Sequence, residues 1–413
     1  MIRKLLPGLK KLVPYDISHL PGDITAGVIV TFLLLPQSIA YATIAGAPIT
    51  MGLLAGTFPL IIYALFGSSN YLSVGPVSMA SLLAFAGISR LTDVDSEQFL
   101  ELMILLSLLV GIVQLMMGIL KFGSIVKHIS QAVIGGFTSA LAIIIILNQI
   151  GAIMGVTLPE YQNIGASFLA IIEHIPKANV LTVLLGCVSF IFLIQLKRKF
   201  PISPGPFIVI FVSIVAVDYF DLDTMGVEIV GAIPKTFSDV SMVMPTIDML
   251  ISLMPIACII AILSFFESFS IAKTLADKEK GAIYPNQEFV SLGFANMTSS
   301  FVGSIPVAGS ISRTAVNYES GARTNLSLFT TAVLMVVAIL YMTPSFYYLP
   351  KTVLAAIIIY AVMKLINVRQ LKGYIRHSLW DAVIFLTTFL ATLMVNMFIG
   401  LVIGMILSFG MNR

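Results

Sequence analysis

The chain has 413 residues, of which 58% are hydrophobic and 10% are charged, and its mean hydropathy is +1.02. A soluble domain is about half apolar and about a quarter charged, so this sequence has too little charge to cover a water-facing surface. Its net charge of +3 is also too small to indicate a nucleic-acid-binding protein. Apolar runs such as 102–106 and 141–147 do not alternate with polar residues. This excludes a membrane β-barrel and predicts an all-α polytopic membrane protein.

Hydropathy predicts about fourteen membrane segments, numbered 1 to 14 in chain order. They lie near residues 23–46, 49–66, 75–89, 98–120, 124–149, 179–196, 205–219, 250–276, 287–302, 309–320, 323–342, 352–366, 379–395 and 397–411. Segments 3 and 10 are too short to cross a hydrocarbon core, which needs about 20 helical residues. We therefore expect two half-length helices whose unpaired backbone groups are satisfied by protein or water.

The distribution of lysine and arginine predicts the orientation of these segments. Five of the six even-numbered connections hold or adjoin cations, whereas the intervening connections hold most of the acids and only isolated cations. The cations of the even-numbered connections are Lys121 and Lys127; Lys197, Arg198 and Lys199; Lys273, Lys278 and Lys280; Arg323; and Lys364, Arg369, Lys372 and Arg376. Since the N-terminus is also basic, both termini are predicted to be cytoplasmic, in a cell (inner or plasma) membrane.

The segments divide into two sets of seven. Residues 1–22 form a cytoplasmic N-terminal segment, 23–220 the first repeat, 221–249 an extracytoplasmic connection and 250–411 the second repeat. An odd number of segments in each set means that the second repeat is inverted relative to the first, a common plan of secondary transporters. Segments 3 and 10 hold equivalent places, and each follows a strand-like stretch, 71–74 or 304–307. Paired interruptions of this kind indicate a substrate site near the bilayer midplane.

The two short segments predict an anion site where their N-termini meet. The first turn of a helix has unpaired N–H groups and carries roughly half a positive charge. Segment 3 would begin at Val77 and Ser78, and segment 10 at Ser310, Ile311 and Ser312. The alternative is that these small residues only allow close helix packing.

Two ionisable residues lie within the predicted membrane segments beside this site. Arg313 lies one turn into segment 10, where a charge is costly unless it faces a cavity or a partner, so it is a candidate anion ligand. Glu267 lies in the apolar run 259–271 and could carry a proton across the membrane. Alternatively, Arg313 and Glu267 form a structural ion pair, Arg313 reaches the cytoplasm, or Glu267 binds sodium.

Segment 1 adds two candidate ligands. Pro36 removes one backbone hydrogen bond and opens the helix locally. Gln37 and Tyr41 are four residues apart and share a face, where an amide and a ring suit a small polar substrate. A simple kink with a packed tyrosine is the alternative.

Catalytic and metal-binding motifs are missing from the sequence. The four histidines, His19, His128, His174 and His377, are scattered, and there is no zinc-protease, phosphate-loop or nucleophile-elbow pattern. We therefore expect no metal, no cofactor and no enzymatic activity.

Several stretches resemble the SulP (sulfate permease) family of anion transporters, over roughly residues 15 to 411. They are Pro21-Gly22-Asp23, Ala26-Gly27, Leu35-Pro36-Gln37-Ser38-Ile39-Ala40-Tyr41-Ala42, Gly46, Gly52-Leu53, Ser73-Val74-Gly75-Pro76-Val77, Glu267-Ser268, Ala272-Lys273 and Gly309-Ser310-Ile311-Ser312-Arg313-Thr314.

The resemblance implies a seven-plus-seven inverted repeat shared with nucleobase transporters (UraA-like). A core domain of segments 1–4 and 8–11 would move against a gate domain of segments 5–7 and 12–14, with the substrate between segments 1, 3, 8 and 10. Gln37, Tyr41, Val77, Ser312 and Arg313 match the family's substrate positions, and Glu267 matches a position linked to proton coupling. The resemblance also implies a homodimer. Family members usually end in a STAS domain, whereas this chain stops at Arg413, so that domain is either cut off or lacking.

The function expected from residues and resemblance together is proton-coupled sulfate symport by elevator-type alternating access. Partners are then a small inorganic anion, protons and the lipid bilayer. Alternatives within the family are bicarbonate, chloride or dicarboxylate transport, coupled to protons or sodium or by exchange. A nucleobase permease of the same fold and an anion channel are further alternatives, although Arg313 beside two helix N-termini favours an anion.

Overall fold

The computed structural model describes residues 6–12, 14–94, 96–123, 130–159, 161, 163–200, 205–231, 246–395 and 397–411. Each of the fourteen predicted segments corresponds to a helix or a pair of helices, so the polytopic all-α prediction is confirmed. By length and apolar composition, seven of the described spans can cross a membrane, and further apolar helices are shorter. The chain divides into two compact units, 1–124 with 232–345 and 125–231 with 346–413.

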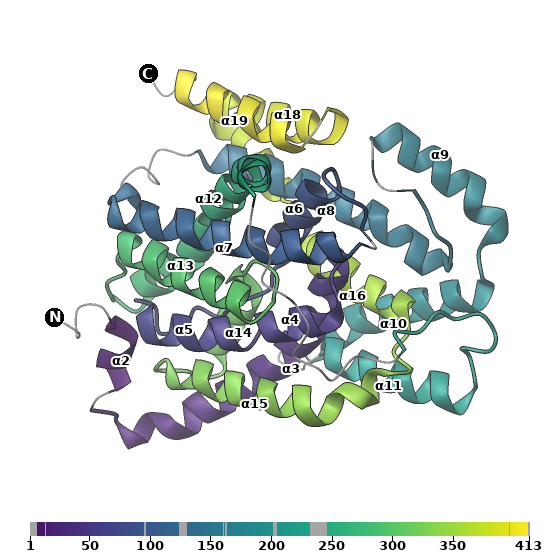
Figure 1. The fold of residues 1–413 in the computed structure, drawn as a ribbon, viewed down its shortest axis with the longest axis horizontal. Helices are drawn as coiled ribbons and strands as arrows, with labels where there is room; N and C mark the ends of the chain where they lie inside the picture. The colour runs from purple at the N-terminus through teal and green to yellow at the C-terminus, as the bar shows by residue number, and fades with distance from the viewer. Residues whose placement is uncertain are drawn as a thin grey trace. The chain divides into compact units, whose positions relative to one another are not determined.

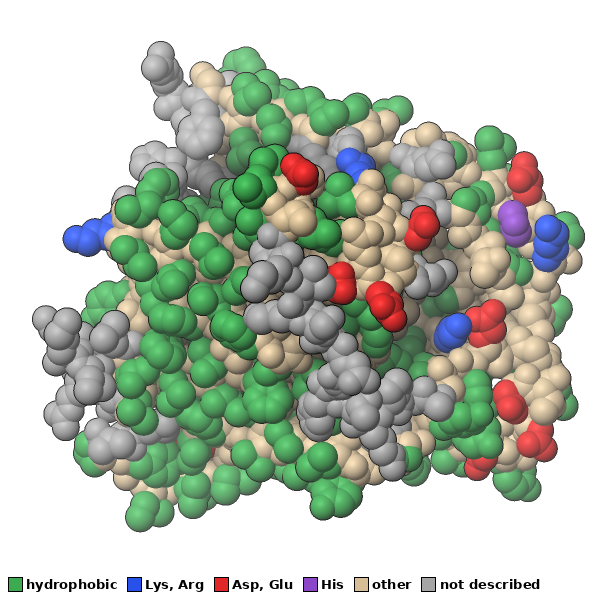
Figure 2. Space-filling view, in the orientation of Figure 1, with side chains coloured by type: hydrophobic (Ala, Val, Ile, Leu, Met, Phe, Trp, Pro, Cys, Tyr) green, Lys and Arg blue, Asp and Glu red, His purple; other side chains and the backbone are tan. Residues whose placement is uncertain are grey.

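The first unit contains both half-length helices. Its elements are α2 (Pro7–Leu12), η1 (Ile17–His19), α3 (Leu20–Ile44), α4 (Ile49–Ala55), α5 (Phe58–Phe66), β1 (Val74–Gly75), α6 (Ser78–Ile88), α7 (Glu97–Ile119), α12 (Ile247–Lys278), α13 (Pro285–Phe301), β2 (Ala308–Gly309), α14 (Ile311–Glu319) and α15 (Leu326–Met342). Helix α13 packs between α7 and α5 (Figure 1). Over these three helices the visible surface consists largely of hydrophobic side chains (Figure 2), as a lipid-facing surface requires.

The second unit is built from the remaining helices. They are α8 (Gln131–Met154), α9 (Ile164–His174), η3 (Ile175–Lys177), α10 (Val180–Lys199), α11 (Gly205–Tyr219), α16 (Lys351–Val362), η5 (Met363–Leu365), α17 (Val368–His377), α18 (Leu379–Met394) and α19 (Met397–Met411), and η4 (Thr343–Phe346) lies at the boundary. Helix α8 packs against α18 and α16, and α10 packs against α16.

Several boundaries differ from the predicted ones. Segment 2 is two helices, α4 and α5, separated at Gly56 and Thr57, a break that continuous hydropathy conceals. Segment 5 is predicted at 124–149, but α8 runs from Gln131 to Met154, and 124–129 lie outside the described residues. Helices α2, α9 and α17 were not predicted, because each lies in a segment too short or too polar for a hydropathy criterion. Of the connection predicted at 221–249, residues 232–245 lie outside the description.

The contact between α7 and α13 depends on small residues. A Cβ atom added to Gly293 would lie 2.8 Å from the backbone nitrogen of Leu115, and one added to Gly111 would lie 2.7 Å from the backbone nitrogen of Met297. Because both obstructions are backbone atoms, a side chain at either position would force the helices apart.

We expect Gly293→Val to destabilise the protein by about 1–3 kcal/mol through this overpacking. Thermal unfolding of the purified protein in detergent measures the effect. Gly410→Val is the matched control, since a Cβ atom added to Gly410, in α19, would meet nothing within 4 Å among the described residues outside its own stretch of helix. Equal melting temperatures for the two variants would contradict the proposed close contact.

Two buried carboxylates fix the ends of helices in the first unit. Asp23, at the start of α3, accepts hydrogen bonds from Tyr15 Oη (3.0 Å), the backbone N–H groups of Arg323 (2.7 Å) and Thr324 (3.0 Å), and Thr324 Oγ1 (2.6 Å). It thereby ties α3 to the connection between α14 and α15. Glu288, in the first turn of α13, accepts from Tyr63 Oη (2.6 Å), Ser68 N (2.7 Å) and Ser68 Oγ (2.6 Å). Fully hydrogen-bonded carboxylates of this kind are structural anchors.

Candidate functional site

The two half-length helices start from one short antiparallel sheet. Strand β1 pairs with β2 in the register Val74 with Gly309 and Gly75 with Ala308. The backbone N–H of Ser310 also donates to the carbonyl oxygen of Ser73, at 3.0 Å. Because α6 follows β1 and α14 follows β2, the antiparallel pairing directs the helices away from each other and keeps both N-termini beside the sheet. The strands lie later than predicted, since only Val74 of 71–74 and no residue of 304–307 belongs to a strand.

A buried polar network holds the approach to α14. Asn296 Oδ1 accepts from the backbone N–H of Val307 (2.8 Å), and its Nδ2 donates to the Val307 carbonyl (3.0 Å) and to Gln114 Oε1 (2.9 Å). Ser268 Oγ on α12 accepts from the backbone N–H of Gly309, at 2.7 Å. Side chains from α12 and α13, the latter supported by Gln114 of α7, thus satisfy backbone groups in and beside β2 that a further strand would pair with in a larger sheet.

The N-termini of the two helices differ in their capping. Val77 is the N-cap of α6 and supplies no side-chain hydrogen bond, so the first-turn amides of α6 keep their positive partial charge without a side-chain acceptor. Ser310 is the N-cap of α14, and its Oγ accepts from the backbone N–H of Arg313 at 3.5 Å. Both helices start where they were predicted to start. The first-turn N–H groups of α6 are therefore the ones that the lack of a side-chain cap leaves available to an anionic ligand.

Arg313 joins the two half-helices and α3. Its side chain is fully buried and donates from Nε to Ser73 Oγ (3.3 Å), and from one terminal nitrogen to Gln37 Oε1 (2.8 Å) and the Pro76 carbonyl (3.0 Å). The other terminal nitrogen is buried and has no hydrogen-bond partner. The guanidinium is thus held rigidly, with one donor group left over.

Gln37 and Tyr41 lie on α3 as the helical spacing predicts. Both side chains are buried, and Pro36 lies within the same helix. Because Gln37 Oε1 accepts a hydrogen bond from Arg313, the Gln37 amide nitrogen can donate to a bound substrate. Tyr41 lies close enough to Arg313 and Glu267 for their charges to act on its hydroxyl.

Glu267 is the third ionisable residue near the starts of α6 and α14, after Arg313 and Tyr41. It is half-buried on α12, and its Oε2 is buried without a hydrogen-bond partner. The charges of Glu267 and Arg313 attract each other, but no ion pair joins them in the described part of the chain. The alternative of a permanent ion pair is therefore absent from this conformation.

The remaining predicted residues lie at the starts of α6 and α14, and within the described part of the chain none of them has a hydrogen bond to the Arg313 guanidinium. Val77 and Ser78 are buried at the start of α6, whereas Ile311 is 46% exposed. Ser312 is also exposed, and its Oγ lies 3.2 Å from Ser310 Oγ. No group of three or more metal-ligating side chains occurs among the residues that the structure describes.

Sequence reasoning did not identify the residues that hold the site together. Ser73 bonds Arg313, and its backbone N–H donates to Thr314 Oγ1 at 3.0 Å. Gln114, Ser268 and Asn296 position β2, as described above. Small polar residues inside apolar helices were the available signal, but sequence alone does not pair them.

Comparison with known proteins identifies the family. The sulfate permease family matches residues 20–388. Sulfate transporter 4.1, chloroplastic, of Arabidopsis thaliana is 35% identical over 353 residues, which are 84% of this chain and 51% of that protein. Probable sulfate transporter Rv1739c of Mycobacterium tuberculosis is 30% identical over 382 residues, 92% of this chain and 68% of that protein. The chain thus spans about half the length of the plant relative.

Two solved structures share the fold. SLC26A9 superimposes with a TM-score of 0.93 at 24% identity, covering 99% of this chain and 68% of that one. The transmembrane domain of the cyanobacterial bicarbonate transporter BicA gives 0.81 at 23% identity, covering 95% and 98%. Since the relatives are transporters, the prediction that the chain is not an enzyme is confirmed. The chain is a multi-pass membrane protein and belongs to the sulfate permease family of anion transporters.

Proposed function

We propose that the chain imports sulfate together with protons by elevator-type alternating access. The observation that carries the anion part is Arg313, a fully buried cation with an unpaired donor nitrogen between the N-termini of α6 and α14. A buried charge that is not in an ion pair is costly, and a bound anion would offset that cost. Gln37, Tyr41, Val77, Ser78, Ser310, Ile311, Ser312 and Arg313 form the proposed substrate site.

Sulfate is proposed because the relatives named above are called sulfate transporters. Sulfate is doubly negative and has only hydrogen-bond acceptors. It suits a site offering the unpaired nitrogen of Arg313, the amide nitrogen of Gln37 and the first-turn N–H groups of α6.

Proton coupling is proposed for Glu267. An ionised Glu267 would oppose the field of Arg313, whereas a protonated one would leave it undiminished. Sulfate is therefore expected to bind best when Glu267 carries a proton, so anion and proton would move together.

The location of the proposed ligands supports the proposed elevator mechanism. All of them, with Glu267, belong to the first unit, so that unit can move the substrate as a rigid carrier. We propose that it is the core domain, that the second unit is the gate domain, and that the helices form two inverted repeats. We further propose that both termini are cytoplasmic and that the chain resides in a cell membrane as a homodimer.

Uptake of labelled sulfate into proteoliposomes tests this function. We expect saturable uptake that accumulates above equilibrium when the outside is acidic, and loss of accumulation when a protonophore collapses the gradient. Bicarbonate, oxalate and fumarate serve as competitors, and uracil as the negative control. Saturable sulfate uptake that does not respond to the proton gradient would refute proton coupling but not sulfate transport. Uptake of one of the competitors without any uptake of sulfate would refute sulfate as the substrate.

A further inference from the structure

Helix α17 is amphipathic and lies between two membrane segments of the second unit. One side packs inward: Gln370 Nε2 donates to Tyr374 Oη at 2.8 Å and to the Gln131 carbonyl at 3.4 Å. The Tyr374 ring also lies 6.4 Å from the Phe385 ring, measured between centroids. The helix is therefore attached along one face to α8 and α18, and its orientation is fixed.

Its outward surface carries an apolar row beside a basic row. Val368 and Ile375, seven residues apart and hence on one face, are each 52% exposed. The adjoining row holds Arg369, Lys372 and Arg376, three and four residues apart and all exposed. Within the described part of the chain, none of these three cations has a hydrogen bond or an ion pair. Aliphatic and unpaired basic rows lying side by side are typical of a helix in a membrane interface.

Trp380 indicates the depth at which α17 lies. It is the chain's single tryptophan, it is 68% exposed, and it stands in the first turn of α18. Tryptophan is enriched at the boundary between hydrocarbon and headgroups, where its ring is buried and its N–H remains hydrated. Since α17 ends directly before α18, its cations are expected at headgroup depth.

The charge around α17 is almost entirely positive. From residue 351 to the end of the sequence, Asp381 is the single acidic residue. Lys364, one turn before α17, lies close enough to Lys197 at the end of α10 for the two ammonium charges to repel each other. A surface with an excess of positive charge attracts anions from its surroundings.

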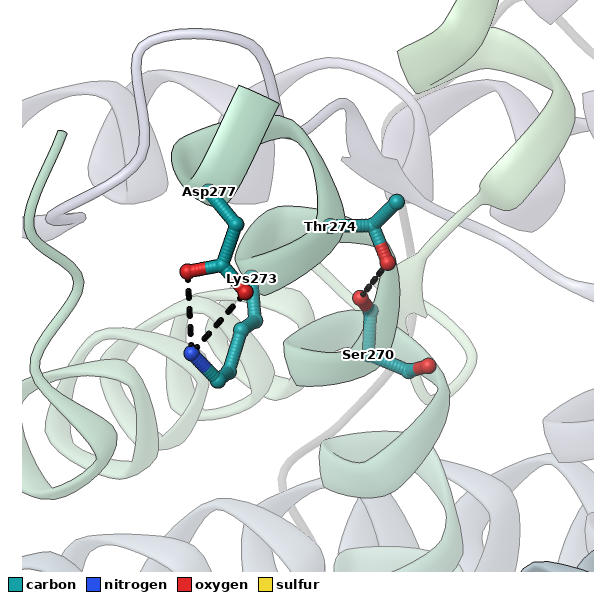
Figure 3. Close-up of polar contacts among 4 residues, drawn as sticks. All are labelled: Ser270, Lys273, Thr274 and Asp277. Carbon is teal, nitrogen blue, oxygen red and sulfur yellow. Dashed lines mark hydrogen bonds and ion pairs between the residues drawn. The ribbon is translucent and has the colours of Figure 1, made fainter. Parts of the chain in front are cut away.

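The basic residues of the first unit are used differently. Lys273 Nζ lies 3.0 Å from a carboxylate oxygen of Asp277 on the next turn of α12 (Figure 3). Lys278 Nζ lies 4.6 Å from the centroid of the Tyr318 ring. These cations have partners inside the protein, so they form a natural comparison for the unpaired row on α17.

We propose that α17 and Trp380 form an interfacial binding site that selects anionic phospholipids over zwitterionic ones. Val368, Ile375 and Trp380 contact the upper acyl chains, and Arg369, Lys372 and Arg376 bind the phosphate and acidic headgroup oxygens. A protein partner is less well matched, because the same surface combines exposed aliphatic groups with a tryptophan at the start of a membrane segment. The site does not depend on the transported ion.

The single tryptophan allows a direct test in proteoliposomes of the full chain. Phosphatidylcholine vesicles are supplemented with equal mole fractions of brominated phosphatidylglycerol or brominated phosphatidylcholine, and quenching of Trp380 fluorescence is measured. We expect the anionic lipid to quench at least about twice as strongly, since each interfacial cation favours anionic lipid by about fivefold. The preference should shrink at high salt, where the Debye length falls to about 3 Å.

Variants that remove positive charge distinguish a specific site on α17 from a general attraction of the positively charged protein for anionic lipid. The triple variant R369Q/K372Q/R376Q should lose the preference, whereas K273Q/K278Q/K280Q, with the same change of charge in the first unit, should keep it. Equal quenching by the two lipids in the unmodified protein, or an unchanged preference in the first variant, overturns the proposal. Strong quenching by aqueous iodide with none by either brominated lipid also overturns it, and indicates a surface for a water-soluble partner.

Discussion

Arg313→Ala is expected to weaken sulfate binding by about 100-fold or more and to abolish uptake into proteoliposomes. The substitution removes a buried positive charge, and truncating one side of a buried charge interaction costs about 2–5 kcal/mol. It also leaves Ser73 Oγ, Gln37 Oε1 and the Pro76 carbonyl without the donor that now joins them. Equilibrium binding of labelled sulfate to the purified variant measures the loss.

Loss of the three hydrogen bonds could also disturb folding, so a second substitution isolates the charge. Gln37→Glu keeps an oxygen acceptor 2.8 Å from the guanidinium but adds a negative charge beside it. We expect it to preserve the melting temperature and to reduce sulfate binding as severely as Arg313→Ala. Lys351→Ala, which breaks an exposed ion pair with Glu228 in the second unit, is the control and should bind sulfate normally. Normal affinity in Gln37→Glu would refute the site as drawn.

The sequence predicts the location of this site better than its internal connections. Small residues, Gly75-Pro76 before Val77 and Gly309 before Ser310, mark the helix starts, because turns and close approaches require them. The bond between Arg313 and Gln37 joins residues 276 positions apart. The bonds from Arg313 to Ser73 and Pro76, on either side of β1, also require the pairing of β1 with β2, and a two-residue strand has no pattern that specifies its partner.

Mean hydropathy conceals two kinds of structural feature in this chain. A hydropathy criterion detects segments whose average over a window is strongly apolar. Helix α17 has an apolar row beside a basic row, so its average hydropathy is that of a polar segment. The break between α4 and α5 is missed for the opposite reason, because the surrounding residues are uniformly apolar. In both cases the mean hydropathy hides the feature, which is the sidedness of α17 and the backbone interruption at Gly56 and Thr57.

Buried carboxylates of the first unit separate into two kinds. Asp23 and Glu288 accept hydrogen bonds at both oxygens, so protonation would break contacts that hold helices together. Glu267 has a buried oxygen without a partner. A carboxylate that gains and loses a proton in every transport cycle must tolerate both states, and an unpaired oxygen costs no structural contact when it is protonated.

Glu267→Gln should therefore uncouple sulfate movement from the proton gradient without preventing sulfate binding. Glutamine resembles the protonated carboxyl in shape and charge, so the variant should bind sulfate about equally at every external pH. The unmodified protein should bind more tightly as the pH falls, because protonation removes the negative charge that opposes Arg313. In proteoliposomes, exchange of internal for external sulfate should persist, whereas accumulation driven by an acidic exterior should disappear.

Glu288→Gln is the matched control, since it neutralises another buried carboxylate of the same unit. Its NH2 group would replace one of the two oxygens and face either Tyr63 Oη or the two Ser68 donors, so we expect a lower melting temperature with coupling retained in the folded fraction. If Glu267→Gln still accumulates sulfate in response to the gradient, the proton travels by another group. If both variants lose stability equally, Glu267 is a structural anchor, and its missing hydrogen bond belongs to one conformation rather than to a transport role.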